Sequence, residues 1–436
     1  MLDGENSGRV LVLGAPDVVA NIVVDGLTFQ NGNVSGSKGG GLRIDTDGNV
    51  TVTMTNIINN YCSGPGGGAY IDGGNVVTVE NTFIDGNEGN ENGGGIFIDR
   101  GLGGGTVTAN LTQNTITNNI CVGRRRGGGV SIGDLIAINE INIKNNIISF
   151  NEGNEGGGAF IHGRNAFINN NEFNGNNGGR GGGFNWIGDL LFASANKIIN
   201  NTGQGLSSIG GGANVQGSSI TILNNLISHN SAQEDGGGLR IFTNGAEGKL
   251  FLINNSIANN SSNEQGGGIQ VYLNDDNCVA NIYNNIIFGN TATEGKDIWI
   301  SNDANDNTIA SPTNLYNNDF DLSANGVFAK IPFPIDPSNL NNVDPLFVDS
   351  ENDDYHLTSD SLLIDKGNNL APELPSKDKD GKPRIIDGNY DNIAYVDIGA
   401  YEFGSPRGDL DGDGDVDGED LRIFAESYGT YVGSQF

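Results

Sequence analysis

The residues best suited to chemistry form an acidic run near the C-terminal end of the chain. Counted from Asp409 as position 1, side-chain oxygens fall at positions 3, 5, 9 and 12, and position 7 offers its backbone carbonyl. Gly414 supplies a sharp turn at position 6, and the apolar Val416 follows at position 8. Hard oxygen ligands at this spacing are typical of a Ca²⁺ loop. The alternative is a solvated acidic tail. The spacing predicts a calcium site made of Asp409, Asp411, Asp413, Asp415, Asp417 and Asp420.

A short helix should hold the end of this loop, because Leu421 to Tyr428 has helical spacing. Together the loop and helix resemble a type I dockerin repeat, in which position 12 is Asp, as it is here. Dockerins carry two such repeats, and this chain shows one. The resemblance implies a Ca²⁺-dependent tether to a cohesin-like scaffold, in the company of carbohydrate-active or adhesive modules.

Most of the remaining chain repeats one pattern: an apolar strand closed by Asn, a short loop, and three glycines. Ten such repeats, 25 to 32 residues apart, indicate a solenoid. The Gly triplets begin at positions 39, 66, 93, 127, 156, 181, 210, 236 and 266. The closing asparagines are Asn31, Asn60, Asn87, Asn119, Asn151, Asn176, Asn201, Asn230, Asn260 and Asn290.

Apolar residues alternate within each repeat, as Leu42 and Ile44 do after the first Gly triplet. A second alternating run and a shorter third piece precede the next closing Asn. Period-2 alternation predicts half-buried strands. Three strands per turn without a helical segment predict an all-β fold, a parallel β-helix of about ten rungs. Asparagines at one corner should then stack as a hydrogen-bonded ladder, which favours a structural role for them.

The pattern loosens after residue 300, which divides the chain into three parts: rungs at 1–300, irregular final rungs with a cap at 301–404, and the calcium segment at 405–436. Leu346, Val348, Leu357 and Ile364 continue the alternation, so we expect them to close the core. This region resembles the C-terminal part of bacterial secreted β-helix proteins similar to polymorphic outer-membrane proteins. The matching residues are Asp344 to Phe347, Asp354 to Leu357, Ile364 to Gly367, Asp380 with Gly381 and Arg384, and Asp397 to Glu402. The rungs themselves are similar to pectate-lyase-like β-helices, which implies the right-handed form.

Composition narrows the choice of partners. Fifty-three acidic residues against 22 basic ones give a formal charge of −31. Nucleic acids and anionic membranes need a basic surface, so neither is expected as a partner. No apolar run is long enough to span a membrane, and no signal peptide follows Met1. We therefore expect a fragment of an extracellular or cell-surface protein, a monomer, whose export signal lies upstream.

Outward-facing positions on the strand after each Gly triplet offer a second candidate site. Aromatic and acidic side chains in neighbouring rungs could stack on sugar rings and bind their hydroxyls. The candidates are Tyr70, Asp72, Phe97, Asp99, Phe160 and His162. The alternative is a solvated face whose aromatic rings are covered by the long loops.

These features predict an extracellular β-helix that binds polysaccharide or is displayed on it, tethered through the calcium segment. A polysaccharide lyase or a glycoside hydrolase is the first alternative, and a structural stalk or adhesin is the second. Two carboxylates facing each other at roughly 5–9.5 Å would favour a hydrolase. A stalk would have no such pair.

Overall fold

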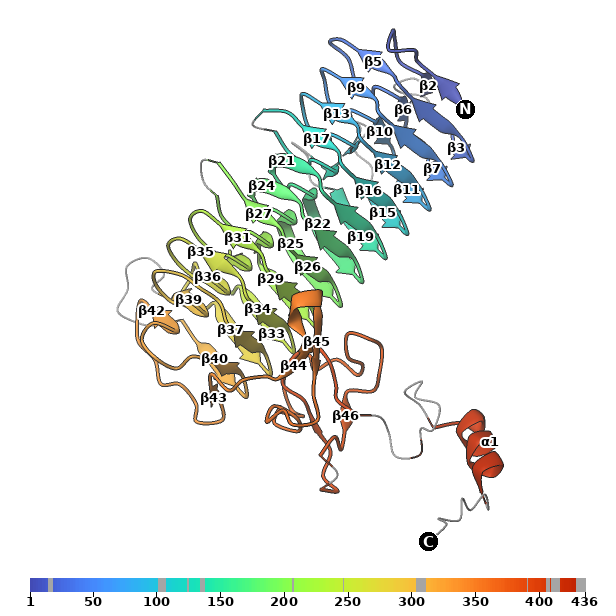
Figure 1. Cartoon of the computed structure of the whole chain (residues 1–436). Coiled ribbons are helices and arrows are strands. Elements are labelled where there is room, and N and C mark those ends of the chain that lie inside the picture. The colour runs from blue at the N-terminus through green and yellow to red at the C-terminus, as the bar shows by residue number, and fades with distance from the viewer. Residues whose placement is uncertain are drawn as a thin grey trace.

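A computed structural model shows an elongated β-solenoid whose rungs stack along one axis, with a C-terminal segment beside its far end (Figure 1). The structure describes residues 1–14, 19–100, 107–123, 125–133, 138–205, 208–245, 247–302, 311–389, 391–404, 408 and 416–428. Successive rungs pair in parallel, as the alternation predicts, and there are about ten turns. Within the described residues, no helix is long and apolar enough to cross a membrane.

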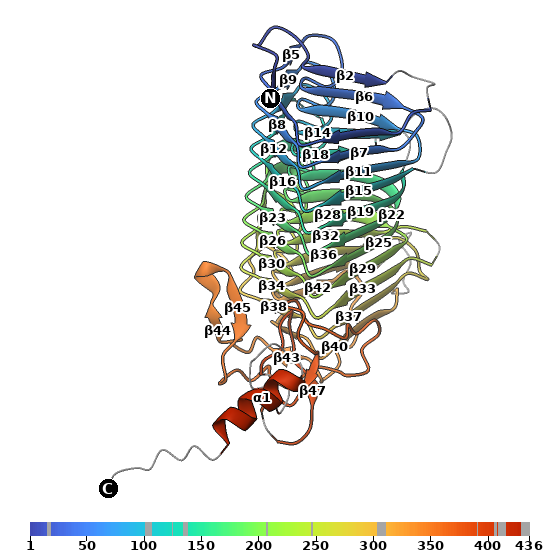
Figure 2. The ribbon, with the colours of Figure 1, turned by 90° about the vertical axis from the view of Figure 1, so that its right-hand side faces the viewer.

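Three parallel sheets run the length of the solenoid (Figure 2). Sheet A holds the strands that precede the corner of the closing asparagines: β1 (Leu2–Asp3), β4 (Thr28–Gln30), β8 (Asn56–Ile58), β12 (Phe83–Asp85), β16 (Thr115–Thr117), β20 (Ile147–Ser149), β23 (Glu172–Asn174), β26 (Lys197–Ile199), β30 (Leu226–Ser228), β34 (Ser256–Ala258), β38 (Ile286–Phe288), β41 (Asp319–Phe320) and β43 (Leu340–Asn341). Sheet C follows that corner with short strands: β5 (Asn33–Val34), β9 (Tyr61–Cys62), β13 (Glu88–Gly89), β17 (Ile120–Cys121), β21 (Glu152–Glu155), β24 (Asn177–Arg180), β27 (Thr202–Gly203), β31 (Ser231–Ala232) and β35 (Ser261–Ser262).

Sheet B contains two strand columns that merge in the middle of the solenoid. The column after the Gly triplets is β2 (Leu11–Gly14), β6 (Leu42–Thr46), β10 (Ala69–Gly73), β14 (Ile96–Arg100), β18 (Val130–Ile132), β22 (Ala159–Asn169), β25 (Phe184–Ser194), β28 (Ala213–Gly217), β32 (Leu239–Thr243), β36 (Ile269–Leu273), β39 (Ile298–Ser301) and β42 (Val327–Ala329). The second column is β3 (Ile22–Asp25), β7 (Val50–Thr53), β11 (Val76–Glu80), β15 (Thr108–Thr112), β19 (Ile138–Lys144), β29 (Ser219–Leu223), β33 (Lys249–Ile253), β37 (Val279–Tyr283) and β40 (Thr313–Tyr316). It joins the first through β22 and β25, which pair with strands of both columns.

Inward side chains form one continuous apolar core. Alternate residues of sheet B, such as Leu42 and Ile44, are fully buried, and one Ile or Phe from most sheet A strands meets them. Phe333 and Ile335 from the proline-rich stretch pack against the end of this core. Each rung therefore buries its apolar face only by stacking on its neighbours.

The Gly triplets are required by close contacts between rungs. The first glycine of a triplet has a positive φ, for example +71° at Gly156. A Cβ on the second, Gly157, would lie 2.4 Å from the carbonyl carbon of Asn177 in the next rung. A Cβ on the third, Gly158, would lie 3.0 Å from the ladder amide of Asn176. The sheet C corner is thus too tight for any side chain at these positions.

The closing asparagines form the predicted ladder. Asn151 Nδ2 donates to Asn176 Oδ1 at 3.0 Å, and Asn176 Nδ2 donates to Asn201 Oδ1 at 3.0 Å. The ladder begins at Asn60, because Gly32 occupies the matching place one residue after Asn31. Asn31 instead has a φ of 53°, so its assignment to the ladder is wrong.

A second asparagine ladder lies at the corner between sheets B and A, where the repeat pattern did not predict one. It runs from Asn114 to Asn339, and each Nδ2 donates to the Oδ1 of the next rung. In most rungs the residue just before the ladder Asn is another Asn. This outer Asn has a left-handed φ, and its side chain lies outside the core. Its members are Asn114, Asn146, Asn171, Asn196, Asn225, Asn255, Asn285, Asn318 and Asn339.

The C-terminal segment lies along the solenoid instead of extending its stack. Strands β44 (Phe347–Asp349) and β45 (Asp354–Leu357) pair antiparallel around a 3-10 turn (Ser350–Asn352), and β46 (Ile385–Ile386) pairs antiparallel with β47 (Tyr395–Val396). Leu346 and Val348 are 39 % and 52 % exposed, so the expectation that they close the core is wrong. Leu357 and Ile364 instead pack on the outside of sheet A around Ile286.

Outer asparagines at the corner between sheets B and A fasten this segment to the solenoid. Asn224 Nδ2 donates to the carbonyl of Lys377 at 2.6 Å, and Asn254 Nδ2 donates to that of Asp397 at 3.0 Å. Behind these contacts Arg384 is buried, and its guanidinium donates to Asn224 Oδ1 at 2.7 Å and to Glu402 at 3.2 Å. The segment is therefore attached through polar groups as well as apolar ones.

Candidate groove on sheet C

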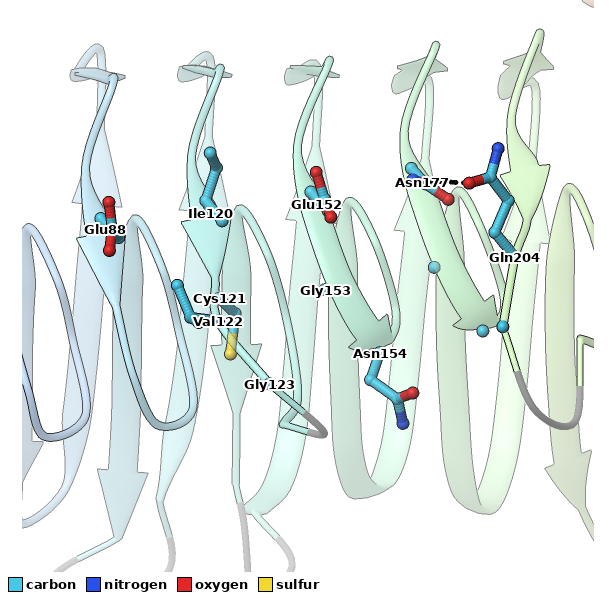
Figure 3. A pocket seen from close by; sticks show the side chains of 13 residues that line it. Glu88, Ile120, Cys121, Val122, Gly123, Glu152, Gly153, Asn154, Asn177 and Gln204 are labelled. Atoms are coloured by element: carbon cyan, nitrogen blue, oxygen red, sulfur yellow. Dashed lines mark hydrogen bonds between the residues drawn. The ribbon is translucent and has the colours of Figure 1, made fainter.

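A groove on the outer face of sheet C has a volume of about 590 Å³ (Figure 3). It crosses five neighbouring rungs, from Glu88 in β13 to Gln204 after β27. Parallel rungs rise about 4.8 Å each, so four steps give a length of roughly 19 Å. The groove therefore suits an extended chain lying along the solenoid axis.

Small residues make the groove hollow. Gly123, Gly153, Gly178, Gly179 and Gly205 line it without side chains. The inward position of sheet C must be small because a Cβ on Gly153 would lie 2.6 Å from the backbone nitrogen of Gly128. The tight corner that demands Gly triplets thus also restricts the inward positions of sheet C.

Side chains from successive strands stand in register along the groove. The Cα atoms of Glu88, Ile120, Glu152 and Asn177 pair from rung to rung in that order. Figure 3 shows these side chains on neighbouring turns, with Asn177 directed toward Gln204. Asn177 Nδ2 donates to Gln204 Oε1 at 3.5 Å, whereas its buried Oδ1 has no hydrogen-bond partner among the described residues.

The lining can make hydrogen bonds and apolar contacts at once. Two exposed carboxylates, those of Glu88 and Glu152, stand on either side of Ile120, which is 39 % exposed. Val122 adds a second aliphatic surface, 42 % exposed. No Lys, Arg or His is among the described residues that line the cavity. This combination suits a neutral ligand rich in hydroxyl groups, which donate to carboxylates and offer C–H faces to aliphatic side chains.

The aromatic residues predicted to stack on sugars are buried. Tyr70, Phe97 and Phe160 are 0, 3 and 1 % exposed, so the expectation of exposed rings is wrong. Loops before the Gly triplets cover them: Lys38 Nζ lies 4.1 Å from the Tyr70 ring, and the Arg126 guanidinium lies 4.6 Å from the Phe160 ring. The path of such a loop follows from no periodic pattern. Only the length of the loops in the sequence indicated that they could cover the rings.

The predicted carboxylates do meet, in an acidic column at the N-terminal half of sheet B. Asp72 pairs in register with Asp45 on one side and with Asp99 on the other. Tyr70 Oη donates to Asp99 at 3.0 Å, and Arg43 Nε donates to Asp45 at 2.6 Å. Burial, followed by the charge of Asp99, raises the pKa of Asp72 to about 6. His162, two turns beyond Asp99, is half-buried.

A row of rings at the opposite end of sheet B was not among the predicted candidates. Phe242 and Tyr272 lie 6.0 Å apart between ring centroids, and Tyr272 lies 5.3 Å from Trp299. Trp299 stacks on Phe328 at 5.9 Å. The signal was present in the sequence, because Phe242 and Tyr272 occupy the fourth position after their Gly triplets.

Most of the predicted calcium loop falls outside the described residues, namely Asp409, Asp411, Asp413 and Asp415. The described part of this segment contains helix α1 (Gly418–Ser427), close to the predicted exit helix. Asp417 caps this helix by accepting from the N–H of Glu419 at 2.7 Å, and the N–H of Asp417 donates to Asp420 at 2.7 Å. Among the described residues, no three His, Cys, Asp or Glu side chains are arranged to hold a metal ion.

Comparisons with protein-family models, with curated proteins and with solved structures found no match for this chain.

Proposed function

We propose that this β-solenoid binds a neutral, extended polysaccharide in the groove on sheet C and works as an extracellular glycan-binding module. The observation that carries the proposal is the register of Glu88, Ile120, Glu152 and Asn177 along an open groove of about 590 Å³. An extended glycan also repeats along its length. Equivalent groups on successive sugars can therefore meet equivalent positions on successive rungs.

Charge supports a neutral glycan over an acidic one. The chain carries a formal charge of −31, and the groove offers two carboxylates without a basic residue among its described lining. A uronate or sulfated chain placed there would meet like charge at short range, which is unfavourable. Hydroxyl groups would instead donate to Glu88 and Glu152.

Replacing Glu152 by Gln is expected to weaken glycan binding about tenfold or more, because a hydrogen bond to a charged acceptor contributes ~1.5–3 kcal/mol. The measurement is a glycan-array screen of the full chain, followed by calorimetric titration with the best neutral oligosaccharide. Glu264→Gln is the matched control, since this exposed glutamate follows β35 on the same sheet but lies outside the groove. Equal affinities for the wild type and Glu152→Gln would remove the groove from consideration.

Hydrolysis of a glycan at the acidic column on sheet B is a second candidate function, separate from binding in the groove on sheet C. Asp72 and Asp99 occupy adjacent rungs, spaced about 4.8 Å apart, which is close to the separation of roughly 5 Å in retaining glycosidases. A carboxyl group with a pKa of about 6, as Asp72 has, can act as a general acid when a second carboxylate lies beside it. In the same screen, reducing ends released by the wild type but not by Asp72→Asn would assign this activity.

We also propose that the segment 405–436 binds Ca²⁺ and tethers the module to a cohesin-like scaffold. The ligand set is the one given by spacing, ending with Asp417 and Asp420 at the start of α1. The helix supports the proposal because a Ca²⁺ loop of this type places its last ligand in the first helical turn. Calcium then supplies a fixed centre of positive charge that orders the acidic run.

Calcium titration of the full chain is expected to give one binding event that disappears when the chain ends at Gly404. The main melting transition should remain, because the apolar core comes from the rungs and from residues up to Ile335. Asp411→Ala in the full chain should also abolish the calcium heat, while Asp25→Ala, an exposed aspartate in β3, should not. Loss of the melting transition together with the calcium heat would contradict a separate calcium segment.

A further inference from the structure

We propose that His356 is a pH-sensitive latch, which holds the β44–β45 hairpin against the solenoid when its ring is protonated and releases it when the proton is lost. The hairpin lies on the outer face of sheet A, beside β34 and β38 (Figure 2). The latch is therefore separate from the groove on sheet C.

Both ring nitrogens of His356 face carboxylates. Nδ1 lies 2.6 Å from Asp354 Oδ1, and Nε2 lies 2.6 Å from Asp380 Oδ2. A neutral imidazole has one N–H and can donate to only one of the two carboxylates. The other carboxylate would then meet a nitrogen lone pair at hydrogen-bond distance. An imidazolium ring donates to both, so this geometry is that of the protonated form.

The surroundings of the ring favour its positive charge. The hydrogen bond to Asp380 is the largest cause that raises the pKa of His356; burial lowers it, and the hydrogen bond to Asp354 raises it further. The ring also lies 4.1 Å from that of Tyr401 between centroids. An aromatic ring attracts a cation at this range. The contacts on all sides thus stabilise the same protonation state.

Other charged groups near the hairpin act on its carboxylates. Lys379 and Lys382 belong to the same turn as Asp380, and their charges favour the ionised form of that carboxyl. Asp353, just before β45, pairs with Lys197 of β26 at 3.2 Å. The first contact keeps the partner of the latch ionised, and the second holds the hairpin without a proton that titrates near neutral pH.

The latch joins the hairpin to a turn that is fixed to the solenoid. The turn begins at Lys377, whose carbonyl accepts from Asn224 Nδ2 at 2.6 Å. Asp378 shapes it, since its Oδ1 accepts from the N–H of Asp380 at 2.9 Å. The carboxylate that faces His356 is thereby held in place, and breaking this contact frees the hairpin from the turn.

Release of the hairpin would uncover an apolar surface on sheet A. Tyr355, next to His356 in β45, is 1 % exposed. It packs against three sheet A side chains, Ile199, Leu226 and Ala258. Its hydroxyl accepts from Asn259 Nδ2 at 3.2 Å and lies 3.4 Å from His229 Nδ1. The proton on His356 therefore controls whether these side chains face the hairpin or the solvent.

The direction of the effect follows from the raised pKa of His356. The latch is fully formed below the pKa of an unfolded histidine, about 6.5, and is lost as the pH rises through the higher pKa of the folded state. Burial also raises the pKa values of Asp397 and Glu402, which makes the C-terminal segment less stable in the same direction. A comparison between the wild type and a His356 variant cancels that contribution.

The test combines NMR of the full chain, labelled in its histidine rings, with hydrogen exchange of the β44 and β45 amides. The His356 signal, recognised by its contact with the Tyr401 ring, is expected to titrate above about 6.5. Protection factors are already corrected for the chemical effect of pH. Those of the hairpin should fall about tenfold for each unit by which the folded pKa exceeds that value.

His356→Gln should protect the hairpin less than the wild type at about pH 5.5, and this difference should vanish above the folded pKa of His356. Asp380→Asn should bring the pKa of His356 down, because it removes the largest cause of the shift. The matched control is Asp360→Asn, at an exposed position after β45, and it should change neither quantity.

A His356 pKa at or below about 6.5, or the same protection difference at every pH, would overturn the proposal. The titration of the wild type decides even where His356→Gln fails to fold, since it needs no variant. Neither glycan nor calcium enters the experiment, so its failure would leave the proposals for the groove and the calcium segment unaffected.

Discussion

Replacing Asn176 by Leu is expected to destabilise the protein by roughly 4 kcal/mol. Asn176 is 1 % exposed and occupies the middle of the sheet C ladder. Its Oδ1 accepts from both the backbone N–H and the Nδ2 of Asn151, each at 3.0 Å, and its Nδ2 donates to the carbonyl of Ile148 at 2.8 Å. Leu fills a similar volume but leaves these buried groups unpaired, and each unpaired group costs about 1–3 kcal/mol.

Urea unfolding followed by circular dichroism measures this loss. Asn75→Leu is the matched control, because Asn75 is exposed between two strands of sheet B and lies in neither ladder. Its change should stay within about 0.5 kcal/mol. An Asn176→Leu midpoint equal to that of the control would mean that water replaces the ladder bonds at little cost.

Replacing Gly157 by Ala is expected to cost roughly 3–5 kcal/mol. The added Cβ would lie 2.4 Å from the carbonyl carbon and oxygen of Asn177 and 2.5 Å from the carbonyl oxygen of Gly182. All three atoms belong to the backbone of the next rung, which cannot move aside without breaking its own pairing. The φ of Gly157 is not in the left-handed region, so the penalty is steric.

Gly8→Ala is the control for this change, because no atom lies within 4 Å of the Cβ it would add. The same urea experiment on both variants separates the contact from the general effect of replacing glycine. A Gly157→Ala variant as stable as Gly8→Ala would show that the rungs can separate locally at this corner.

The repeating part of the fold could be predicted because the apolar alternation, the Gly triplets and the closing asparagines all recur with the same spacing. Alternation such as Leu42 and Ile44, the triplet at Gly156 and the ladder residue Asn176 each indicate the same rung. The second ladder was also legible, since Asn145–Asn146 and Asn170–Asn171 recur at the rung spacing. The first rungs conceal it, because Thr55 and Thr82 stand where the later rungs have the ladder Asn.

The C-terminal segment could not be predicted in this way. Leu346, Val348 and Leu357 alternate like rung residues, yet only Leu357 is buried, and it packs on the outside of the solenoid. Periodicity reports which side chains share a face of a strand, and it does not report which surface that face meets.

The candidate sites show the same difference between features set by the repeats and features set by irregular segments. The column of Asp72 and Asp99 followed from the rung register, which the repeats fix. The burial of Tyr70 did not, because it depends on how the loop carrying Lys38 folds over the ring. The groove on sheet C is lined in part by residues without side chains, such as Gly179 and Gly205, and motifs of reactive side chains do not indicate such a feature.

The docked C-terminal segment changes how the solenoid should come apart. In a plain stack each rung interacts only with its two neighbours, so melting can start at either end and spread. Here Asn224, Asn254 and Asn317 hold one continuous segment across several turns, from Lys366 to Asp397. Those turns must be lost together, which makes them one cooperative unit and leaves the N-terminal rungs as the end where fraying begins.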